Sequence, residues 1–95
     1  MNTVKKSILN NQFIYNLRTK FEIDEESYSQ LVYQMQNLKK VLSTEATIDK
    51  ELFAYLYVIP NIIRGQNRNE YSEDQRERLN EMEIEIDNLI IEILN

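Results

Sequence analysis

Carboxylates are the side chains in this sequence that offer the most chemistry. On a helix expected near the C-terminus, one strip carries Glu77, Glu81, Asn88 and Glu92, and Glu85 lies beside it. Carboxylates alone can bind Mg²⁺ or act as a general acid and base. The chain has no histidine and no cysteine, which excludes Ser-His-Asp and Cys-His catalysis, thiolate zinc sites and disulfides. A carboxylate–metal site is therefore the main route by which this chain would be an enzyme.

The spacing of the carboxylates argues against that route. All-helical nucleotide pyrophosphohydrolases hold Mg²⁺ with paired E-x-x-E and E-x-x-D motifs on facing helices. Here E-x-x-E occurs at Glu22 with Glu25 and at Glu70 with Glu73, which are expected at helix starts or in loops rather than in mid-helix. The sequence therefore predicts no enzyme: no catalytic residues, no metal and no cofactor. A carboxylate–metal nucleotide hydrolase is the less favoured alternative.

The elements that position these side chains are expected to be helices. A chain of 95 residues predicts a single domain, and one glycine and one proline favour a few long elements over a sandwich or barrel. Apolar residues recur at helical spacing over residues of about 3–21, 25–43, 50–64 and 73–94. The prediction is an all-α fold, an antiparallel four-helix bundle.

Two of these segments leave an alternative open. Residues 3–21 form either one helix or a short N-terminal turn and a second helix that are separated by a bend at Asn10 and Asn11. Residues 82–87 also alternate between apolar and charged, which is typical of a short strand, but the sequence offers no second strand to pair with them.

Several residues mark where the helices begin and end. Asp24 and Asp49 are predicted N-caps, and Ser72 with Gln75 matches the capping box, in which each side chain bonds the other residue's backbone N–H. Gly65 follows the third helix and suits a left-handed C-cap.

The third helix holds the most unusual residue for a helix interior, Pro60. A proline there costs about 3 kcal/mol and removes a backbone hydrogen bond, so this helix is predicted to be kinked or broken at Pro60. Opposite its core stripe lie Tyr57, Asn61 and Arg64, at positions i, i+4 and i+7. Tyrosine and arginine are enriched in interaction hot spots, and these three residues are predicted to bind a partner.

The last helix carries a second predicted contact surface. Ile84 and Ile91 are seven residues apart, on the side opposite the apolar seam, and Glu81 and Glu85 lie near Ile84. This surface is predicted to bind either another protein or a second copy of this chain.

The charge distribution narrows the classes of partner. The net charge is −5, yet residues 1–20 carry four basic side chains and no acid, whereas residues 70–95 carry nine acids and two bases. An acidic chain without a basic recognition helix predicts no nucleic-acid binding, and no apolar run approaches the ~20 residues of a membrane span. The lack of cysteine and of an export signal predicts a cytoplasmic protein.

The spacing of Leu56, Tyr57, Tyr71, Gln75, Leu79 and Met82 resembles that of small bacterial immunity proteins. Those are cytoplasmic four-helix bundles that protect a producing cell from its own toxin or bacteriocin. The resemblance covers roughly the C-terminal half and implies a non-catalytic binder. The acidic charge is closer to that of inhibitors of nuclease toxins. The leading hypothesis is therefore a protein-binding module that neutralises a toxin, and the alternative is a small structural or regulatory homodimer.

Overall fold

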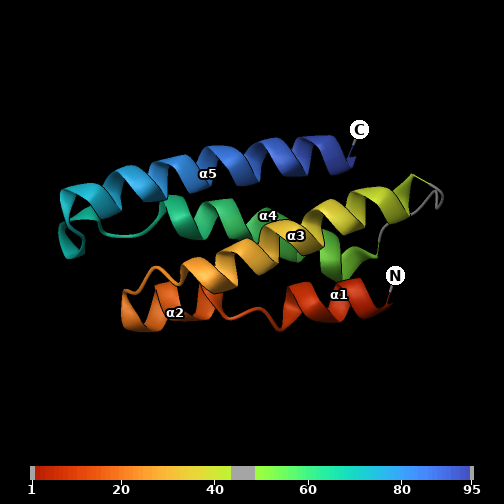
Figure 1. Cartoon of the computed structure of the whole chain (residues 1–95), viewed down its shortest axis with the longest axis horizontal. Helices are drawn as coiled ribbons and strands as arrows, with labels where there is room; N and C mark the ends of the chain where they lie inside the picture. Colours follow the sequence, from red (N-terminus) through yellow and green to blue (C-terminus); the bar gives the residue numbers. More distant parts are fainter. Residues whose placement is uncertain (1, 44–48, 95) are drawn as a thin grey trace.

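The computed structural model describes residues 2–43 and 49–94, and these residues are all-helical (Figure 1). The elements are α1 (Asn2–Leu9), α2 (Phe13–Lys20), α3 (Glu25–Leu42), α4 (Lys50–Arg64), the 3-10 helix η1 (Arg68–Glu70) and α5 (Glu73–Leu94). The predicted helices over 25–43, 50–64 and 73–94 are confirmed to within about a residue. No strand occurs in the described ranges, and residues 82–87, the alternative strand, are helical.

Of the two alternatives for residues 3–21, the single helix is wrong and the division at Asn10 and Asn11 is confirmed, because residues 10–12 separate α1 from α2. The Oδ1 of Asn11 accepts the N–H of Phe13 at 2.9 Å, and its Nδ2 donates to the carbonyl of Ser27 at 2.8 Å. Ile8 and Phe13 are both fully buried, although on one straight helix they would point roughly 140° apart at 100° per residue. The division lets both side chains enter the same core.

The predicted N-caps are confirmed. An oxygen of Asp24 accepts the N–H of Ser27 at 3.1 Å, and the Oδ1 of Asp49 accepts the N–H groups of the second and third residues of α4 at 2.9 and 3.2 Å. Ser72 and Gln75 form the reciprocal capping box, with bonds of 2.9 and 3.2 Å. Each cap satisfies backbone donors that the first helical turn leaves without a partner.

The predicted left-handed C-cap at Gly65 is wrong, because this glycine has φ −79° and ψ −5°. The end of α4 is stabilised instead by Arg68, whose guanidinium donates to the carbonyl of Ile63 at 2.9 Å. Among the described residues the left-handed one is Phe21, at φ 50° and ψ 37°, whose N–H donates to the carbonyl of Asn16. A side chain in that region crowds its own backbone, so Phe21 stores strain at the end of α2.

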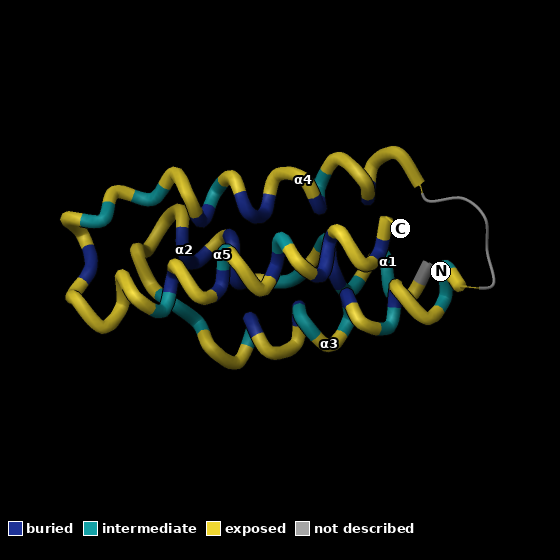
Figure 2. Tube along the Cα trace, turned by 90° about the horizontal axis from the view of Figure 1, so that it is seen from above, coloured by how far each residue is buried: buried dark blue, intermediate teal, exposed yellow. Residues whose placement is uncertain are grey.

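From α2 onward the helices alternate in direction, whereas α1 and α2 run the same way (Figure 1). Consecutive helices are not always neighbours. The α1 and α2 segments both pack against α3 and α4, and α5 also packs against α3 and α4. Figure 2 shows α3 and α4 on opposite sides of the molecule, with α5 and α2 between them. The neighbours α3 and α5 therefore run in the same direction.

Large apolar residues from all five α-helices form one core. Its fully buried members include Ile8, Leu17, Leu31, Met35, Leu38, Leu52, Leu56, Ile59, Ile63, Leu79, Met82 and Ile86.

Pro60 is buried as well, and α4 continues through it to Arg64, so α4 is not broken at the proline. Ile59 and Ile63 on the same face are fully buried, and this burial offsets the backbone hydrogen bond that the proline removes. Among the described residues, no helix is long and apolar enough to span a membrane.

Candidate functional site

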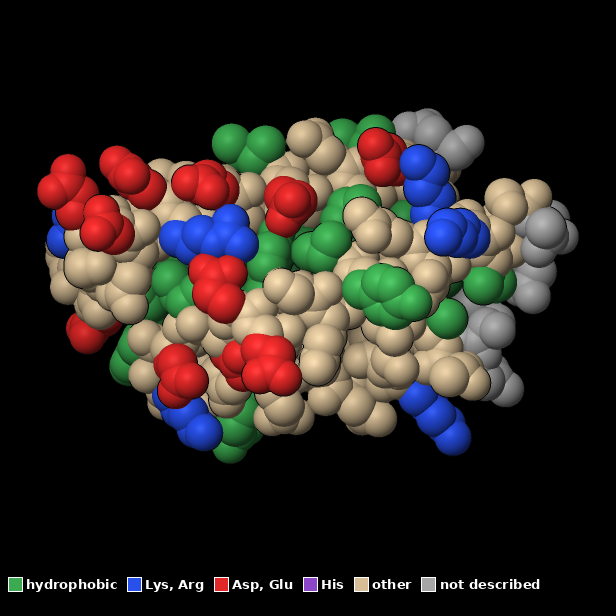
Figure 3. Space-filling model, viewed as in Figure 1, with side chains coloured by type: hydrophobic (Ala, Val, Ile, Leu, Met, Phe, Trp, Pro, Cys, Tyr) green, Lys and Arg blue, Asp and Glu red, His purple; other side chains and the backbone are tan. Residues whose placement is uncertain are grey.

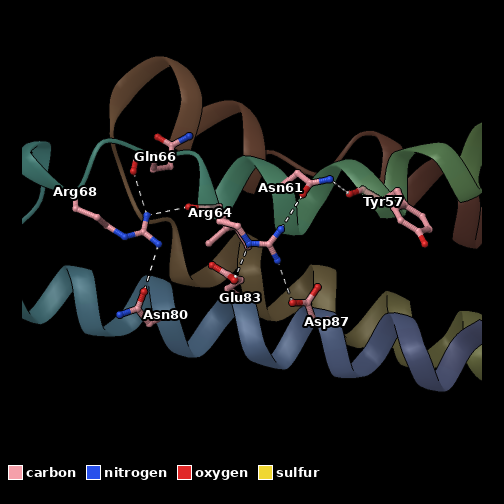
Figure 4. Close-up of polar contacts among 9 residues, drawn as sticks. Tyr57, Asn61, Arg64, Gln66, Arg68, Asn80, Glu83 and Asp87 are labelled. Atoms are coloured by element: carbon pink, nitrogen blue, oxygen red, sulfur yellow. Dashed lines mark hydrogen bonds and ion pairs between the residues drawn. The ribbon is translucent and has the colours of Figure 1, made fainter.

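The predicted stripe of Tyr57, Asn61 and Arg64 lies on the border between α4 and α5 (Figure 4). The Nδ2 of Asn61 donates to the carbonyl of Tyr57 at 3.0 Å, and its Oδ1 accepts from Arg64 at 2.9 Å. Arg64 also donates to Glu83 at 3.0 Å and to Asp87 at 3.4 Å. Arg64 therefore joins α4 to α5 and Asn61 orients it from within α4, while Tyr57 remains 56% exposed.

The same border continues toward the loop after α4. Besides its bond to Ile63, Arg68 donates to the carbonyl of Gln66 at 3.4 Å and to the side chain of Asn80 at 3.4 Å (Figure 4). Arg68 thus holds the loop against α5. This side of α5 is a structural seam in which polar groups of the chain satisfy one another.

The other side of α5 brings together three of the predicted contact residues. Glu81, Ile84 and Glu85 line one groove between α5 and α3, together with Gln36, Asn88, Leu89 and Glu92. Ile84 is 62% exposed at this groove. Ile91 is 56% exposed but is not among the lining residues. The structure therefore groups Ile84 with the two glutamates and places Ile91 and the α4 stripe elsewhere.

Two adjoining hollows extend this groove along the seam. One shares Gln36 and Glu85 with it and adds Tyr28, Ser29, Val32, Tyr33 and Arg78. The other shares Gln36, Leu89 and Glu92 and adds Lys39, Lys40 and Ser43. We call the whole feature, from Tyr28 and Arg78 to Ser43 and Glu92, the α3–α5 groove. Figure 3 shows this face, with apolar side chains visible between the acidic groups that follow α5 and the body of α3.

The α3 side of the groove was not predicted from the sequence. Gln36 was not singled out at all, and Tyr33 was not recognised as a contact residue, although it is 60% exposed. A large aromatic residue on the outer face of the helix over 25–43 is the signal in the sequence that would have indicated this surface.

A network at one end of the groove joins α3 to α5. Arg78 donates two bonds to Glu25, at 2.7 and 2.9 Å, and its guanidinium lies 5.2 Å from the centre of the Tyr28 ring. The Tyr28 hydroxyl donates to Glu85. Burial, together with this bond to Glu85, raises the pKa of Tyr28, and the bonds from Arg78 lower the pKa of Glu25. The network fixes the Glu85 carboxylate at the groove.

The charged groups of the groove form ion pairs and are not arranged as metal ligands. At its far end Lys39 lies 3.4 Å from Glu92, and Arg78 lies 3.4 Å from Glu81. Within the part of the chain that the structure describes, no three histidine, cysteine, aspartate or glutamate side chains cluster as ligands for one ion. The arrangement combines an apolar surface with anionic groups, which suits an apolar and cationic ligand surface.

Comparisons with known proteins add no relative to this picture. None of the protein-family models matches the chain, and neither a curated protein nor a solved structure does so.

Proposed function

We propose that this chain is a cytoplasmic, non-catalytic protein-binding module whose contact surface is the α3–α5 groove. In this proposal the fold is a four-helix bundle in which α1 and α2 together form a divided first helix. One observation carries the proposal: Ile84, a large aliphatic residue, is 62% exposed at a groove that also presents Glu81 and Glu85. An apolar side chain surrounded by polar groups in a concave surface favours association with another protein.

The α4 stripe is the weaker candidate surface, because none of its three residues lines the α3–α5 groove. Asn61 and Arg64 bond each other, and Arg64 bonds Glu83 and Asp87. A partner that used these groups would have to replace contacts within the chain. The exposed fraction does not separate the two surfaces, because Tyr57 is 56% and Ile84 62% exposed. The concave surface around Ile84 and Leu89 therefore favours the groove.

A toxin is the partner class that we favour. The support is the resemblance to immunity proteins described above and the acidic excess over residues 70–95. An acidic surface suits a basic target, because complementary charge increases the rate of association and selects the partner.

Site-specific cross-linking tests the proposal. A photo-reactive amino acid replaces Ile84 in one variant and Val58 in the other, since Val58 is an aliphatic residue of α4 that is 42% exposed outside the groove. We expect a discrete adduct with one protein of the native lysate from position 84 and not from position 58. Equal labelling from both positions, or none from either, would contradict a specific contact at the groove.

A homodimer is the second candidate, because Ile84 and Ile91 are both more than half exposed along α5. Sedimentation velocity over a hundredfold range of concentration separates the two candidates. A dimer predicts a mass that falls with dilution and with Ile84→Glu. A constant monomer mass would exclude self-association through this helix.

A further inference from the structure

The α3–α5 groove has the dimensions of a short helix. Along α5 it extends from Arg78 to Glu92, which is about 21 Å at 1.5 Å per residue. Most of the surface exposed inside its centre and at its far end is apolar, with Ile84 at the rim and Leu89 below it. The end lined by Tyr28 and Arg78 is more polar than apolar, so the apolar part of the groove is its centre and far end. An open apolar surface between two helices is the kind of site on which an amphipathic helix docks.

The charge of the groove limits what occupies it. Its centre is lined by Glu81, Glu85 and Glu92, and the described residues that line this centre include no cation. The cations of the groove lie at its two ends. Arg78 at one end is paired with Glu25 and Glu81, and Lys39, which is paired with Glu92, lines the other end together with Lys40. The centre is therefore the negative part of the groove.

This charge argues against two classes of occupant. A second copy docked symmetrically on the same groove would bring its own three glutamates against these, and like charges in contact are unfavourable. The phosphates of a nucleic acid would be repelled in the same way. A cationic protein segment is the class that complements both the apolar surface and the carboxylates.

We propose that the α3–α5 groove binds a basic amphipathic helix of another protein. The apolar side of that helix packs on Ile84 and Leu89, and its lysines or arginines face the glutamates. Glu81, Glu85 and Glu92 follow one another at intervals of four and seven residues, or about 6 and 10 Å along the helix. A partner helix of about 15 residues with cations at the same intervals matches them. This inference rests on the protein-binding function proposed above.

Two synthetic peptides test the charge requirement. Both are helical, about 15 residues long and identical in their apolar positions; one carries lysine at the intervals of four and seven, and the other carries glutamate there. We expect the lysine peptide to bind the full chain in fluorescence anisotropy at about 0.1 M salt, and the glutamate peptide to bind at least tenfold more weakly. No binding of the lysine peptide at 100 µM, or equal binding of both, overturns the proposal.

Matched variants test whether the groove is the site. Glu81→Gln with Glu92→Gln removes two charges at the groove, and Glu22→Gln with Glu70→Gln removes two exposed charges outside it. We expect the groove pair to weaken binding of the lysine peptide about tenfold and the control pair less than twofold. Ile84→Asn and Ile91→Asn form a second comparison, with about fivefold and less than twofold losses expected. Equal losses within either comparison would show that the peptide binds elsewhere.

The test of the basic helix can be separated from the test of protein binding in general. All four variants change exposed positions, and thermal unfolding confirms that each still folds. If position 84 gives an adduct but the lysine peptide binds no better than the glutamate peptide, the protein-binding function stands and the proposal of a basic helix as the partner is wrong. If there is neither an adduct from position 84 nor a preference for the lysine peptide, both proposals are wrong.

Discussion

Replacing Tyr28 by phenylalanine isolates the hydrogen bond that joins α3 to α5. The Tyr28 side chain is 2% exposed, and its ring lies 5.0 Å from that of Phe13 and 5.2 Å from the Arg78 guanidinium. Phenylalanine keeps the ring and therefore these contacts, so the substitution opens no large cavity. It removes only the hydroxyl that donates to Glu85.

The expected loss of stability depends on the charge and the exposure of the hydrogen-bond acceptor, Glu85. A hydrogen bond to a charged group contributes about 1.5–3 kcal/mol to stability. Glu85 is exposed, so in the variant a water molecule can donate a hydrogen bond to its carboxylate in place of the Tyr28 hydroxyl. We expect Tyr28→Phe to lower the free energy of unfolding by about 1 kcal/mol, which for a domain of this size lowers Tm by about 4–8 °C.

The control is Tyr33→Phe, about one and a half turns further along the same helix, where the tyrosine is 60% exposed. We expect that variant to stay within about 0.5 kcal/mol of the parent, as surface substitutions usually do. Both are measured by urea unfolding at pH 7. If the two variants lose the same stability, the Tyr28 hydrogen bond does not stabilise the packing of α3 on α5, and the reasoning fails.

The pH dependence gives a second check on the same bond. Burial, with Glu85, raises the pKa of Tyr28 above its ordinary value, which in unfolded chains is about 10. A raised pKa means that the folded state holds the proton more tightly, so the contribution to stability is fully present below about pH 10. It is lost as the pH rises above that value toward the folded-state pKa. The difference between the parent and Tyr28→Phe is therefore expected to narrow above pH 10, and a constant difference would contradict the assignment.

Three further substitutions probe other parts of the fold by urea unfolding. Leu56→Ala removes a side chain that is 1% exposed and is expected to cost about 2–5 kcal/mol through the cavity that it leaves; a cost below 1 kcal/mol would contradict the core assignment. Phe21→Asn places a residue that tolerates the left-handed region at φ 50° and is expected to raise stability by about 0.5–1 kcal/mol, whereas a loss would show that the half-exposed ring stabilises the fold. Asp24→Ala removes the N-cap of α3 and is expected to cost about 1 kcal/mol at pH 7. Because bonds from Ser27 lower the pKa of Asp24, that cost is present above the unfolded pKa of about 4 and disappears as the pH falls through the lower folded value.

Local features of the fold could be predicted because their signals lie within a few residues of one another. Asp24 precedes two glutamates, and Ser72 stands three residues before Gln75, so each helix start is determined by its own neighbours. The division of the first helix was one of two alternatives, and the phases of Ile8 and Phe13 already conflict on a straight helix. The left-handed conformation of Phe21 had no such signal among its sequence neighbours.

The neighbours of each helix could not be predicted in the same way. Periodicity identifies which face of α5 is buried, but it does not identify whether α3 or α4 covers each flank. The helical periodicity of α5 was enough to predict that Ile84, Glu81 and Glu85 lie on its exposed side. The identity of the opposite wall, with Gln36 and Tyr33, followed only from α3 lying beside α5. The partners of Arg64 were missed for the same reason.

The acidic residues of α5 divide into two groups with different consequences. Glu83 is 23% exposed and pairs with Arg64 at 3.0 Å, so its charge contributes to holding α4 in place. Glu81 and Glu92 are 68% and 53% exposed, and their nearest cations lie at 3.4 Å. Ion pairs at that exposure contribute about 0–1 kcal/mol, so a cation from a partner replaces them at little cost. The flank of α5 that faces α4 is therefore structural, and the flank that faces α3 keeps its charge accessible beside Ile84.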